Sequence, residues 1–494
     1  MFSLSDTVRK TVELLRSGEV ELAKATFGNP TTATGGIQLW NLDEAVKTLV
    51  PKYTPLRNSI PRVGGQFARQ ANWKAVTAID SANGPIGVPD GTRNADIAVT
   101  VDEYNAVFKT LAVEASATFQ SEWAAKGLES TQGIARKAGV HKYMVGEESV
   151  ILGGNTTGTG IALGVPATPT GALVAGGSMT AQANRCYVVA LTHDGWKASS
   201  VAGGVATTTS VTPADGSAAY TVNRGSSNKS AESAAVTTAS SNLSVRWSVT
   251  AIRGAVAYAW FVGLTGAGNC LLAGITATNS FLQTADATGT QAASAITADK
   301  SQDQYVFDGL ITQISKSGSN GYWRSLDNAT LTATGKGGIV EFDTLLVDRF
   351  VNYKCSSYEI IMSANQSKAA SDAMRTGATA TPLSINVISD SQGNLRGGSR
   401  FTEYTHPITG EVLPLIVHTD LPDGTIIFKL KDVGALYDED RVPNVWQMAM
   451  RQDMFSIEWP ARTLRYELAV IADGVLQGYF PAGNGIIANV ALPS

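Results

Sequence analysis

Four histidines are the first candidates for metal binding or acid–base catalysis: His141, His193, His406 and His418. None has a spacing such as H-E-x-x-H, which places two imidazole rings on one helix face around a zinc ion. His406 lies in TEYTHPITGE and His418 in LIVHTD, which indicate a loop and a strand. The sequence therefore predicts no histidine metal site.

Two glycine-rich stretches are candidates for phosphate binding. TGKGG at 334–338 contains the glycine–lysine step of a phosphate-binding loop, but the earlier glycine is missing and neither Ser nor Thr follows Lys336. GGNTTGTGIALG at 153–164 misses the G-x-G-x-x-G spacing of a dinucleotide-binding turn by one residue. Both stretches are better interpreted as flexible loops.

Nucleophiles and further metal ligands are equally sparse. No G-x-S-x-G is present, so the nucleophile turn of a serine hydrolase is not indicated. Cys186, Cys270 and Cys355 form no C-x-x-C and are expected to be free thiols in the core. The acidic run at 438–440 lacks the glycine and glutamate of a calcium-binding EF-hand, and a solvated turn is the simpler interpretation. We expect no enzyme activity and no cofactor.

Composition narrows the class of protein. The chain has 494 residues, of which 44% are hydrophobic and 16% charged, so it can bury a large core. Its net charge of −4 argues against a general nucleic-acid coat, which needs a positive surplus to neutralise phosphates. The N-terminus has no apolar signal-peptide core, and no stretch of 18 apolar residues occurs. We expect synthesis in the cytoplasm and no contact with a membrane.

The N-terminal part is predicted to be an arm that packs on something else. Residues 3–24 have the spacing of an amphipathic helix, and a Gly/Thr-rich link follows at 28–36. A second short helix is expected at 41–49, before Pro51. Small helices joined by flexible links cannot bury much surface by themselves.

Residues 66–113 are predicted to form a long two-stranded ribbon. QFARQANWKAVTAID and NADIAVTVDEYNAVF alternate in polarity, and SANGPIGVPDGTR between them is rich in turn residues. An isolated hairpin is marginally stable in water, so contacts to other chains should order this one. A long helix is then predicted over 115–152, although Gly127, Gly133 and Gly139 each cost about 1 kcal/mol relative to alanine.

From 165 to 300 charged residues become rare, and Thr, Ser, Ala and Gly dominate. Short runs typical of strands recur with turns between them, which predicts an antiparallel sandwich. The runs are RCYVVALT, TTTSVTP, SAAYTVNR, LSVRWSVTAI, AYAWFVGL, NCLLAGIT and FLQT. The charge-rich pattern resumes with DKSQDQYVFDGLITQI, so we interpret 165–300 as an insertion into a host domain that is α+β.

The host segments, taken in order, resemble the major capsid protein of tailed bacteriophages, which has the Hong Kong 97 fold. EESVILGGN is similar to the end of that family's spine helix, and YVFDGLITQI to the segment that follows. IIMSANQSKAASDAM resembles the family's strand that is followed by a small helix, and VLPLIVHTDLPDGTIIFKLKDVG resembles a later stretch of the family's sequence. The resemblance covers about 1–165 and 300–494. RCYVVALT with HDGWKAS, and RWSVTAIRGAVAYAWFVG, resemble fibronectin-III or bacterial immunoglobulin-like modules.

This resemblance implies a division of the chain. The expected parts are an N-terminal arm at 1–65, an extended E-loop ribbon at 66–113, the spine helix and start of the peripheral domain at 114–164, the inserted β-sandwich at 165–300, the second part of the peripheral domain at 301–369, the axial domain at 370–445, and C-terminal strands of both domains at 446–494.

The resemblance also implies function and partners. We expect pentamers and hexamers that form an icosahedral shell in the virion around double-stranded DNA, with portal, scaffold or decoration proteins as further partners and the insert pointing outward. Three alternatives stay open at this point: an encapsulin-like compartment shell, a phage tail or baseplate protein, and a secreted β-rich glycosidase. A tail protein would lack the long helix after the ribbon, and a glycosidase would need a carboxylate pair in a cleft.

Three ribbon residues are expected to contact a neighbouring subunit: Arg69, Trp73 and Lys74. Trp73 has too few apolar neighbours on its own hairpin to bury an indole, and Trp and Arg dominate interface energetics. Some capsids of the family join subunits by a Lys–Asn isopeptide bond. No acceptor for Lys74 can be identified, so non-covalent assembly is the expectation.

Overall fold

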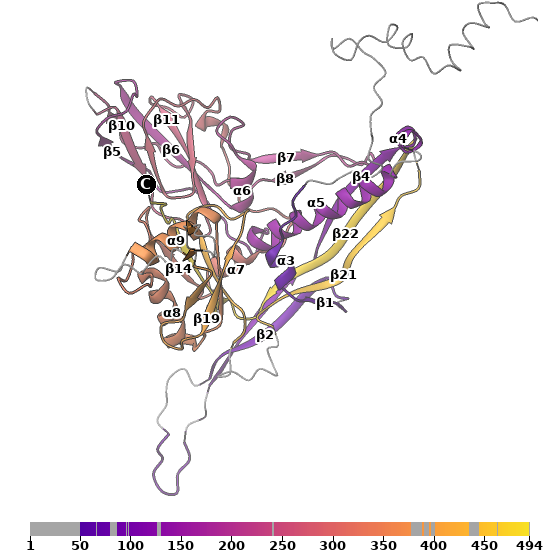
Figure 1. The fold of residues 1–494 in the computed structure, drawn as a ribbon, viewed down its shortest axis with the longest axis vertical. Coiled ribbons are helices and arrows are strands. Elements are labelled where there is room, and N and C mark those ends of the chain that lie inside the picture. The colour runs from indigo at the N-terminus through magenta and orange to yellow at the C-terminus, as the bar shows by residue number, and fades with distance from the viewer. Residues whose placement is uncertain are drawn as a thin grey trace, which may run out of the picture.

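The computed structural model describes residues 50–65, 67–79, 86–94, 96, 98–125, 130–239, 242–376, 388–389, 395–396, 401–433, 444–461 and 463–493. Within these ranges the chain mixes helices and strands (Figure 1). The helices expected at 3–24 and 41–49, and the acidic run at 438–440, lie outside the described residues.

A four-stranded sheet and one long helix form the first layer of the host. The sheet has the order β1-β21-β22-β4, with β1 parallel to β21 and the other pairs antiparallel. Helix α5 lies across β4 and β22, and Gly139 lets it approach closely, because a Cβ there would be 3.4 Å from Val470 Cγ2. The elements are β1 (Arg62–Val63), β4 (Lys109–Thr118), α5 (Thr131–Gly153), β21 (Trp446–Glu458) and β22 (Arg465–Gly478).

The long helix is shorter than the prediction of 115–152. Residues 109–118 are strand β4, because Leu111, Val113 and Ala115 alternate with exposed positions and face α5. Thr118 caps the short helix α4 (Phe119–Ala124) through its hydroxyl, and Ser130 caps α5 in the same way. The continuous helix was therefore wrong at its N-terminal end, whereas its exit at EESVILGG is correct.

The second layer of the host is a six-stranded sheet with the order β14-β23-β20-β15-β19-β18. EIIM forms most of β15, a buried strand inside this sheet. The sheet combines strands from both sides of the expected boundaries at 369/370 and 445/446. Its strands are β14 (Tyr322–Ser325), β15 (Tyr358–Met362), β18 (Glu403–Thr405), β19 (Val412–Val417), β20 (Ile426–Leu430) and β23 (Gly485–Ala488); the helices of this part are α7 (Leu310–Ser315), α8 (Val340–Tyr353), α9 (Ala364–Thr376) and the single turn η4 (Pro481–Gly483).

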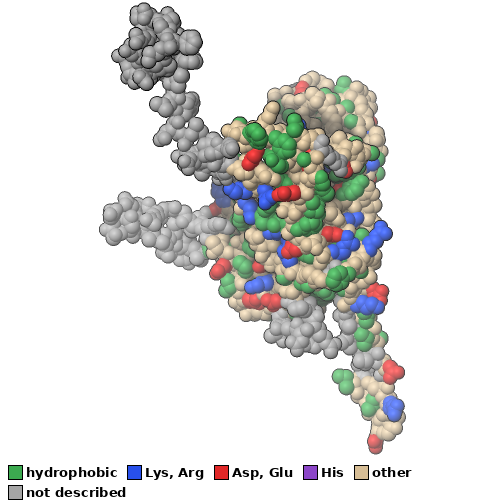
Figure 2. Space-filling view, turned by 90° about the vertical axis from the view of Figure 1, so that its right-hand side faces the viewer, with side chains coloured by type: hydrophobic (Ala, Val, Ile, Leu, Met, Phe, Trp, Pro, Cys, Tyr) green, Lys and Arg blue, Asp and Glu red, His purple; other side chains and the backbone are tan. Residues whose placement is uncertain are grey.

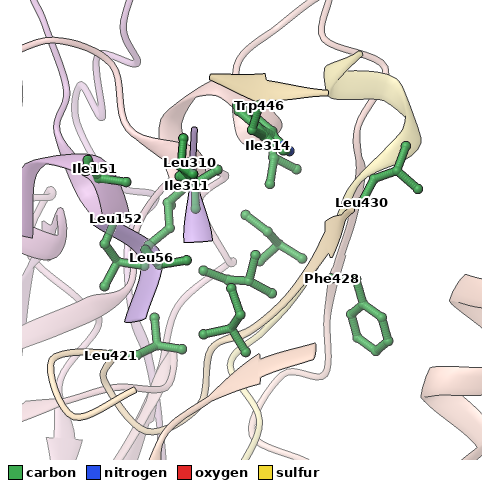
Figure 3. Packing of buried hydrophobic residues seen from close by; sticks show 14 of the residues in the cluster. Leu56, Ile151, Leu152, Leu310, Ile311, Ile314, Leu421, Phe428, Leu430 and Trp446 are labelled. Atoms are coloured by element: carbon green, nitrogen blue, oxygen red, sulfur yellow. The ribbon is translucent and has the colours of Figure 1, made fainter. Parts of the chain in front are cut away.

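One hydrophobic core joins the two layers. It runs from Leu56 in the short helix α3 (Pro55–Ser59), past the end of α5, to the strands of the six-stranded sheet. Figure 3 shows Leu56, Leu152 and Ile311 close together, with Phe428 and Leu430 on β20 beyond them. Residues before 165 and after 300 therefore contribute to one folded core, although the segment 165–300 separates them in the sequence.

The predicted ribbon is an antiparallel hairpin of β2 (Gln70–Ile79) and β3 (Val99–Val107). It leaves the body at the lower end in Figure 1 and forms a sheet of its own. It ends at 107, because the chain passes at Phe108 into β4 of the four-stranded sheet.

Residues 165–300 contain all seven strands that the sequence predicts. Two antiparallel sheets, β13-β10-β5 and β12-β11-β6-β9, share a core around Trp247 and Trp260. Not all of this segment belongs to the sandwich: HDGWKA forms helix α6 (His193–Ala198), and β7 and β8 pair as a separate hairpin. The strands of this segment are β5 (Thr170–Val174), β6 (Ala183–Leu191), β7 (Thr208–Val211), β8 (Tyr220–Asn223), β9 (Val236–Thr237), β10 (Ser244–Ser248), β11 (Ala257–Gly263), β12 (Cys270–Thr276) and β13 (Ser280–Gln283), with the turn η2 (Ala293–Ala295). Outside this segment, the host also contains the two-residue strands β16 (Ile388–Ser389) and β17 (Leu395–Arg396).

Candidate assembly surfaces

The projecting hairpin has one face that nothing in the described chain covers. The register places Lys74 opposite Glu103, and the two side chains form an ion pair in solvent. On either side of Glu103 along β3, the side chains of Val101 and Val107 are 48% and 42% exposed. Figure 2 shows hydrophobic and charged side chains side by side on this narrow extension. A mixed apolar and charged strip of this kind is suited to contact with another protein surface.

The opposite face of the hairpin is joined to the body by aromatic rings. Trp73 stacks on Tyr104 of its own hairpin with 5.8 Å between ring centroids, and it lies 6.1 Å from the ring of Tyr479 after β22. The Tyr479 hydroxyl accepts a hydrogen bond from Gln447 on β21. Trp73 therefore has one aromatic neighbour on its own hairpin and a second on the body of the same chain, and the second was not foreseen in the sequence.

The three predicted contact residues do not form one patch. Trp73 faces the body and lines a cavity of about 320 Å³ at the hairpin root, where its Nε1 meets no acceptor among the described residues. Lys74 points to the free face, as alternation along a strand requires. Arg69 is exposed just before β2, and its carbonyl accepts a hydrogen bond from Phe108 N at 3.3 Å. The intersubunit role of all three stays a prediction.

A second apolar surface, not predicted from the sequence, lies at the far end of the four-stranded sheet. Trp123 of α4 is 79% exposed and Leu464, just before β22, is 75% exposed. Next to them in the sequence, Phe119 and the exposed Tyr466 pack edge to face with 4.4 Å between ring centroids. The sequence predicted a helix over this segment, but only the fold shows that the segment around 464 lies beside it, where Phe119 N donates to the Leu464 carbonyl oxygen at 3.2 Å.

Two consecutive buried glutamates of α5 hold the start of the described chain. Glu148 accepts hydrogen bonds from two backbone N–H groups of α3, at 2.9 and 2.7 Å, and lies 2.8 Å from His418 Nε2. Glu147 pairs with Arg57 at 2.6 Å and with Arg62 at 2.8 Å. Buried carboxylates are tolerated only with such partners. The described end of the expected N-terminal arm, up to Arg62, is thus fixed on the long helix.

The insert is docked on the host. His193 of α6 lies 2.7 Å from the carbonyl oxygen of Asp420, and Lys197 pairs with the Asp420 carboxylate at 2.6 Å. Arg253 donates to the carbonyl oxygen of Gly321, and Val256 is part of the host core. The insert therefore has a defined position on the body.

The described residues hold no catalytic constellation. His141 bonds a backbone oxygen, His193 and His418 serve the contacts above, and His406 accepts from two backbone N–H groups through Nδ1. Along these ranges no group of three His, Cys, Asp or Glu could hold a metal ion, and the three cysteines are buried and free. TGKGG is the loop before α8, whose first turn carries two acidic residues that disfavour a phosphate.

No protein-family model matches the sequence, and no curated protein matches it. Among solved structures, the chain is similar to the capsid of a native GTA particle (9% identity, 94% of this chain and 99% of that chain, TM-score 0.41). It is also similar to the capsid of Myoviridae phage XM1 (8% identity, 92% and 97%, TM-score 0.40) and to that of cyanophage P-SCSP1u (8%, 94% and 98%, 0.42). Similarities with such low identities and TM-scores assign no function to this chain.

Proposed function

We propose that this chain is the major capsid protein of a tailed bacteriophage, a structural subunit without enzyme activity that assembles into an icosahedral shell. The observation that carries the proposal is the hairpin β2–β3. It extends from the body with valines and an ion pair in solvent on one face, although a two-stranded hairpin has little stability of its own. A neighbouring subunit beneath it would supply the missing contacts.

Two further features support a shell subunit. The exposed apolar residues at the far end, Trp123 and Leu464, give the molecule a second contact surface away from the hairpin. Helix α5 follows the hairpin after the short helix α4, which favours a capsid subunit over a tail or baseplate protein. Along the described ranges, no helix combines the length and apolar character needed to cross a bilayer.

The finer parts of the proposal follow from the resemblance. Pentamers and hexamers form the shell, double-stranded DNA is held inside it, and portal, scaffold or decoration proteins bind it. Arg69, Trp73 and Lys74 contact the neighbouring subunit, 165–300 is an immunoglobulin-like insert on the outside, and the subunit is made in the host cytoplasm and ends in the virion. In the same scheme, α5 is the spine helix of a Hong Kong 97 fold, with the domain division stated above.

The test is negative-stain electron microscopy of the purified protein at several concentrations. Closed shells, or rings of five and six subunits, are the expected result. Shells that carry no DNA after expression beside a phage packaging system would favour an encapsulin-like compartment instead. A protein that stays monomeric at high concentration, or that forms open tubes, would contradict the proposal.

A further inference from the structure

Strand β4 is the border of the four-stranded sheet on the side away from β1. All ten of its residues pair with β22 in a register without a bulge. Figure 1 shows it running along the layer to α4 at the far end. Within the described ranges, it is the longest border strand among the sheets of three or more strands. Its outer side therefore offers a long, regular row of backbone groups.

Backbone hydrogen bonds show which groups of β4 point outward. The N–H of Phe119, just after β4, donates to the carbonyl oxygen of Leu464 on the β22 side at 3.2 Å. The N–H of Phe108, just before β4, donates instead to the carbonyl oxygen of Arg69 at 3.3 Å. Since backbone groups alternate between the two sides of a strand, odd-numbered residues of β4 bond β22 and even-numbered residues point outward. Along the described ranges, the outward groups of four residues have no backbone partner: Thr110, Ala112, Glu114 and Ser116.

The side chains of β4 also leave room for a further strand. Leu111, Val113 and Ala115 face α5 and pack against the shared core, yet each is only half-buried. A strand added at this border would cover their outer flank and remove apolar area from water.

Other borders in the molecule are closed or short. The border strand β12 is covered by a loop, since Leu272 donates its N–H to the Gln291 carbonyl oxygen at 3.0 Å. Strand β18 has three residues, and Pro407 follows it closely. Proteins protect border strands with prolines, bulges, charges or covering loops, because an open border pairs with other chains. From 110 to 118, β4 has neither a proline nor a bulge, and Glu114 is its one charged residue.

We propose that β4 pairs in antiparallel fashion with β4 of a second copy across a two-fold axis, so that one continuous sheet runs through both subunits. This rests on the proposed function and names one contact of the shell, because an icosahedral shell has two-fold axes between subunits. A two-fold contact uses the same surface on both copies, so β4 itself is the only strand required. The hairpin strand β2 is as long as β4, but its bulge between Val76 and Ala78 makes it a poorer partner.

The free groups of β4 limit the register. In an antiparallel pair the residues whose groups point at each other lie opposite, so even-numbered residues must face even-numbered residues. Arg69 occupies the place opposite Phe108, so β4 of the second copy has to end before it. An axis at Val113 would put Thr118 of the partner subunit in that place. This register is therefore excluded.

Charge excludes the next register. An axis at Glu114 would place the two Glu114 carboxylates directly opposite each other, and opposed like charges destabilise a sheet. With the axis at Ala115, Glu114 instead lies opposite Ser116 of the partner subunit, whose hydroxyl is a hydrogen-bond donor. The pairing covers residues 112–118 of each copy. It also brings α4, with the exposed Trp123, next to the start of the other β4.

The first test is disulfide cross-linking in assembled shells. Glu114→Cys and Ser116→Cys are prepared separately and then assembled together; the natural cysteines are buried and free. Oxidation of the mixed shells should give a dimer band on a denaturing gel, because directly opposed residues are within reach of a disulfide. Each variant assembled alone should give little dimer, since its cysteines then occupy diagonal positions.

Mixed shells without a dimer band, or an equally strong band from either variant alone, would overturn the pairing and leave the proposed function standing. A dimer of Glu114→Cys with Lys74→Cys, in place of the expected one, would also overturn it and would put the neighbour's hairpin at this border. A protein that forms no shells would instead overturn the proposed function, together with the inference that rests on it.

The second test removes one outward backbone donor. Ala112→Pro deletes an N–H that takes no part in the ladder to β22, so the subunit should fold and unfold in urea near the natural midpoint. It should raise the protein concentration needed for assembly, followed by light scattering, by about tenfold or more. The matched control Ala112→Thr changes the same side chain but keeps the N–H, and it should assemble like the natural protein.

Equal assembly of the proline and threonine variants would overturn the proposed pairing. If the proline variant does not fold, the cross-linking of Glu114→Cys with Ser116→Cys decides by itself, because both substitutions lie on exposed positions of β4.

Discussion

His193 shows how one buried side chain joins the insert to the host. Its ring is 2% exposed and fills the space beside Gly153, where any added Cβ would meet the ring carbon and nitrogen atoms. Nε2 lies 2.7 Å from the Asp420 carbonyl oxygen, so this nitrogen carries the proton and donates it. The pKa of His193 is lowered to about 4, chiefly by burial; the Lys197 ammonium contributes to the lowering, and the carbonyl and carboxylate of Asp420 oppose it.

This environment predicts a pH dependence of stability. The folded pKa of about 4 lies below the ordinary value of 6.5, so between these two values the unfolded chain binds more protons than the folded chain. The free energy of unfolding should therefore fall as pH drops from 6.5 to 4, by up to about 3 kcal/mol, and this group adds no further loss below that. Urea unfolding over this range, with His193→Gln as the comparison, measures the effect. The variant keeps an N–H donor and should show a flatter profile; parallel profiles would contradict the assignment.

Trp73 carries a second residue-scale prediction. Trp73→Ala removes both aromatic contacts at the hairpin root, so the hairpin should lose about 1–3 kcal/mol of its attachment while the shared core stays folded. Amide hydrogen exchange should speed up in β2 and β3 and stay unchanged in β20, and Trp73→Phe should restore much of the protection. Lys74→Ala is the matched control on the other face: its ion pair is exposed, so exchange should not change. Equal effects of both alanine variants would mean that the aromatic contacts of Trp73 do not attach the hairpin to the body.

At the scale of elements, an unusual segment closes the edge of β6. The strand β9 pairs only with Ala183 and Asn184, and a stretch that is not a strand covers the rest. Three serines spaced three residues apart each donate a backbone N–H to a β6 carbonyl and accept the N–H of the same β6 residue through the hydroxyl. The pairs are Ser227 with Ala190, Ser230 with Val188, and Ser233 with Cys186.

This arrangement satisfies a sheet edge without offering a free strand to another chain. Ser230→Ala should leave the buried N–H of Val188 without its acceptor, which costs about 1–3 kcal/mol. Ser217→Ala is the control, since its hydroxyl bonds Asp215 on an exposed turn and its loss should change stability by less than about 0.5 kcal/mol. Thermal unfolding followed by circular dichroism measures both variants. A Ser230→Ala protein as stable as the control would show that water replaces the hydroxyl.

The same elements show what local pattern can and cannot predict. The strands of the insert were predictable because apolar runs of four to eight residues between turns have a direct physical signature. The segment SSNKSAES was not predictable, because serines spaced three residues apart match the side-chain period of neither a strand nor a helix. The segment 115–118 was assigned to the helix because ASAT has small side chains, whose alternation between buried and exposed positions is weak in the sequence.

At the scale of the whole molecule, the order of elements was predictable but their pairing was not. The four-stranded sheet joins Arg62 and Val63 to strands near 110, 450 and 470, and no local period contains that information. The contact of Trp73 with Tyr479 depends on the same long-range pairing, which is why the hairpin could be predicted and its anchor could not. Candidate assembly surfaces at segments such as 464–466 become visible only after the layers are assembled.

An insertion should be removable without loss of the host fold, and the connections of 165–300 support this in one respect. Its two ends lie side by side, since the N–H of Leu163 donates to the Ser301 hydroxyl at 3.0 Å, so a short linker can join them. Its contacts with the host indicate, however, that removing the insert would lower the stability of the host. Val256 leaves the host core with the insert, and the contacts of His193 and Arg253 are lost.

We therefore expect an intermediate outcome when Val165–Lys300 is replaced by a short Gly/Ser linker. The shortened host should fold but should unfold at a lower urea concentration than the host in the full chain, because its core loses Val256 and Asp420 loses its contacts with His193 and Lys197. The isolated segment 165–300 should unfold cooperatively on its own, since one of its two cores lies wholly within it and Leu163 is the buried residue of the other that lies outside. Urea unfolding of the three chains separates these contributions, and electron microscopy of the shortened chain tests assembly. Equal host midpoints with and without the insert would show that docking adds no stability, whereas a shortened chain that cannot fold would make the insert a required part of the body.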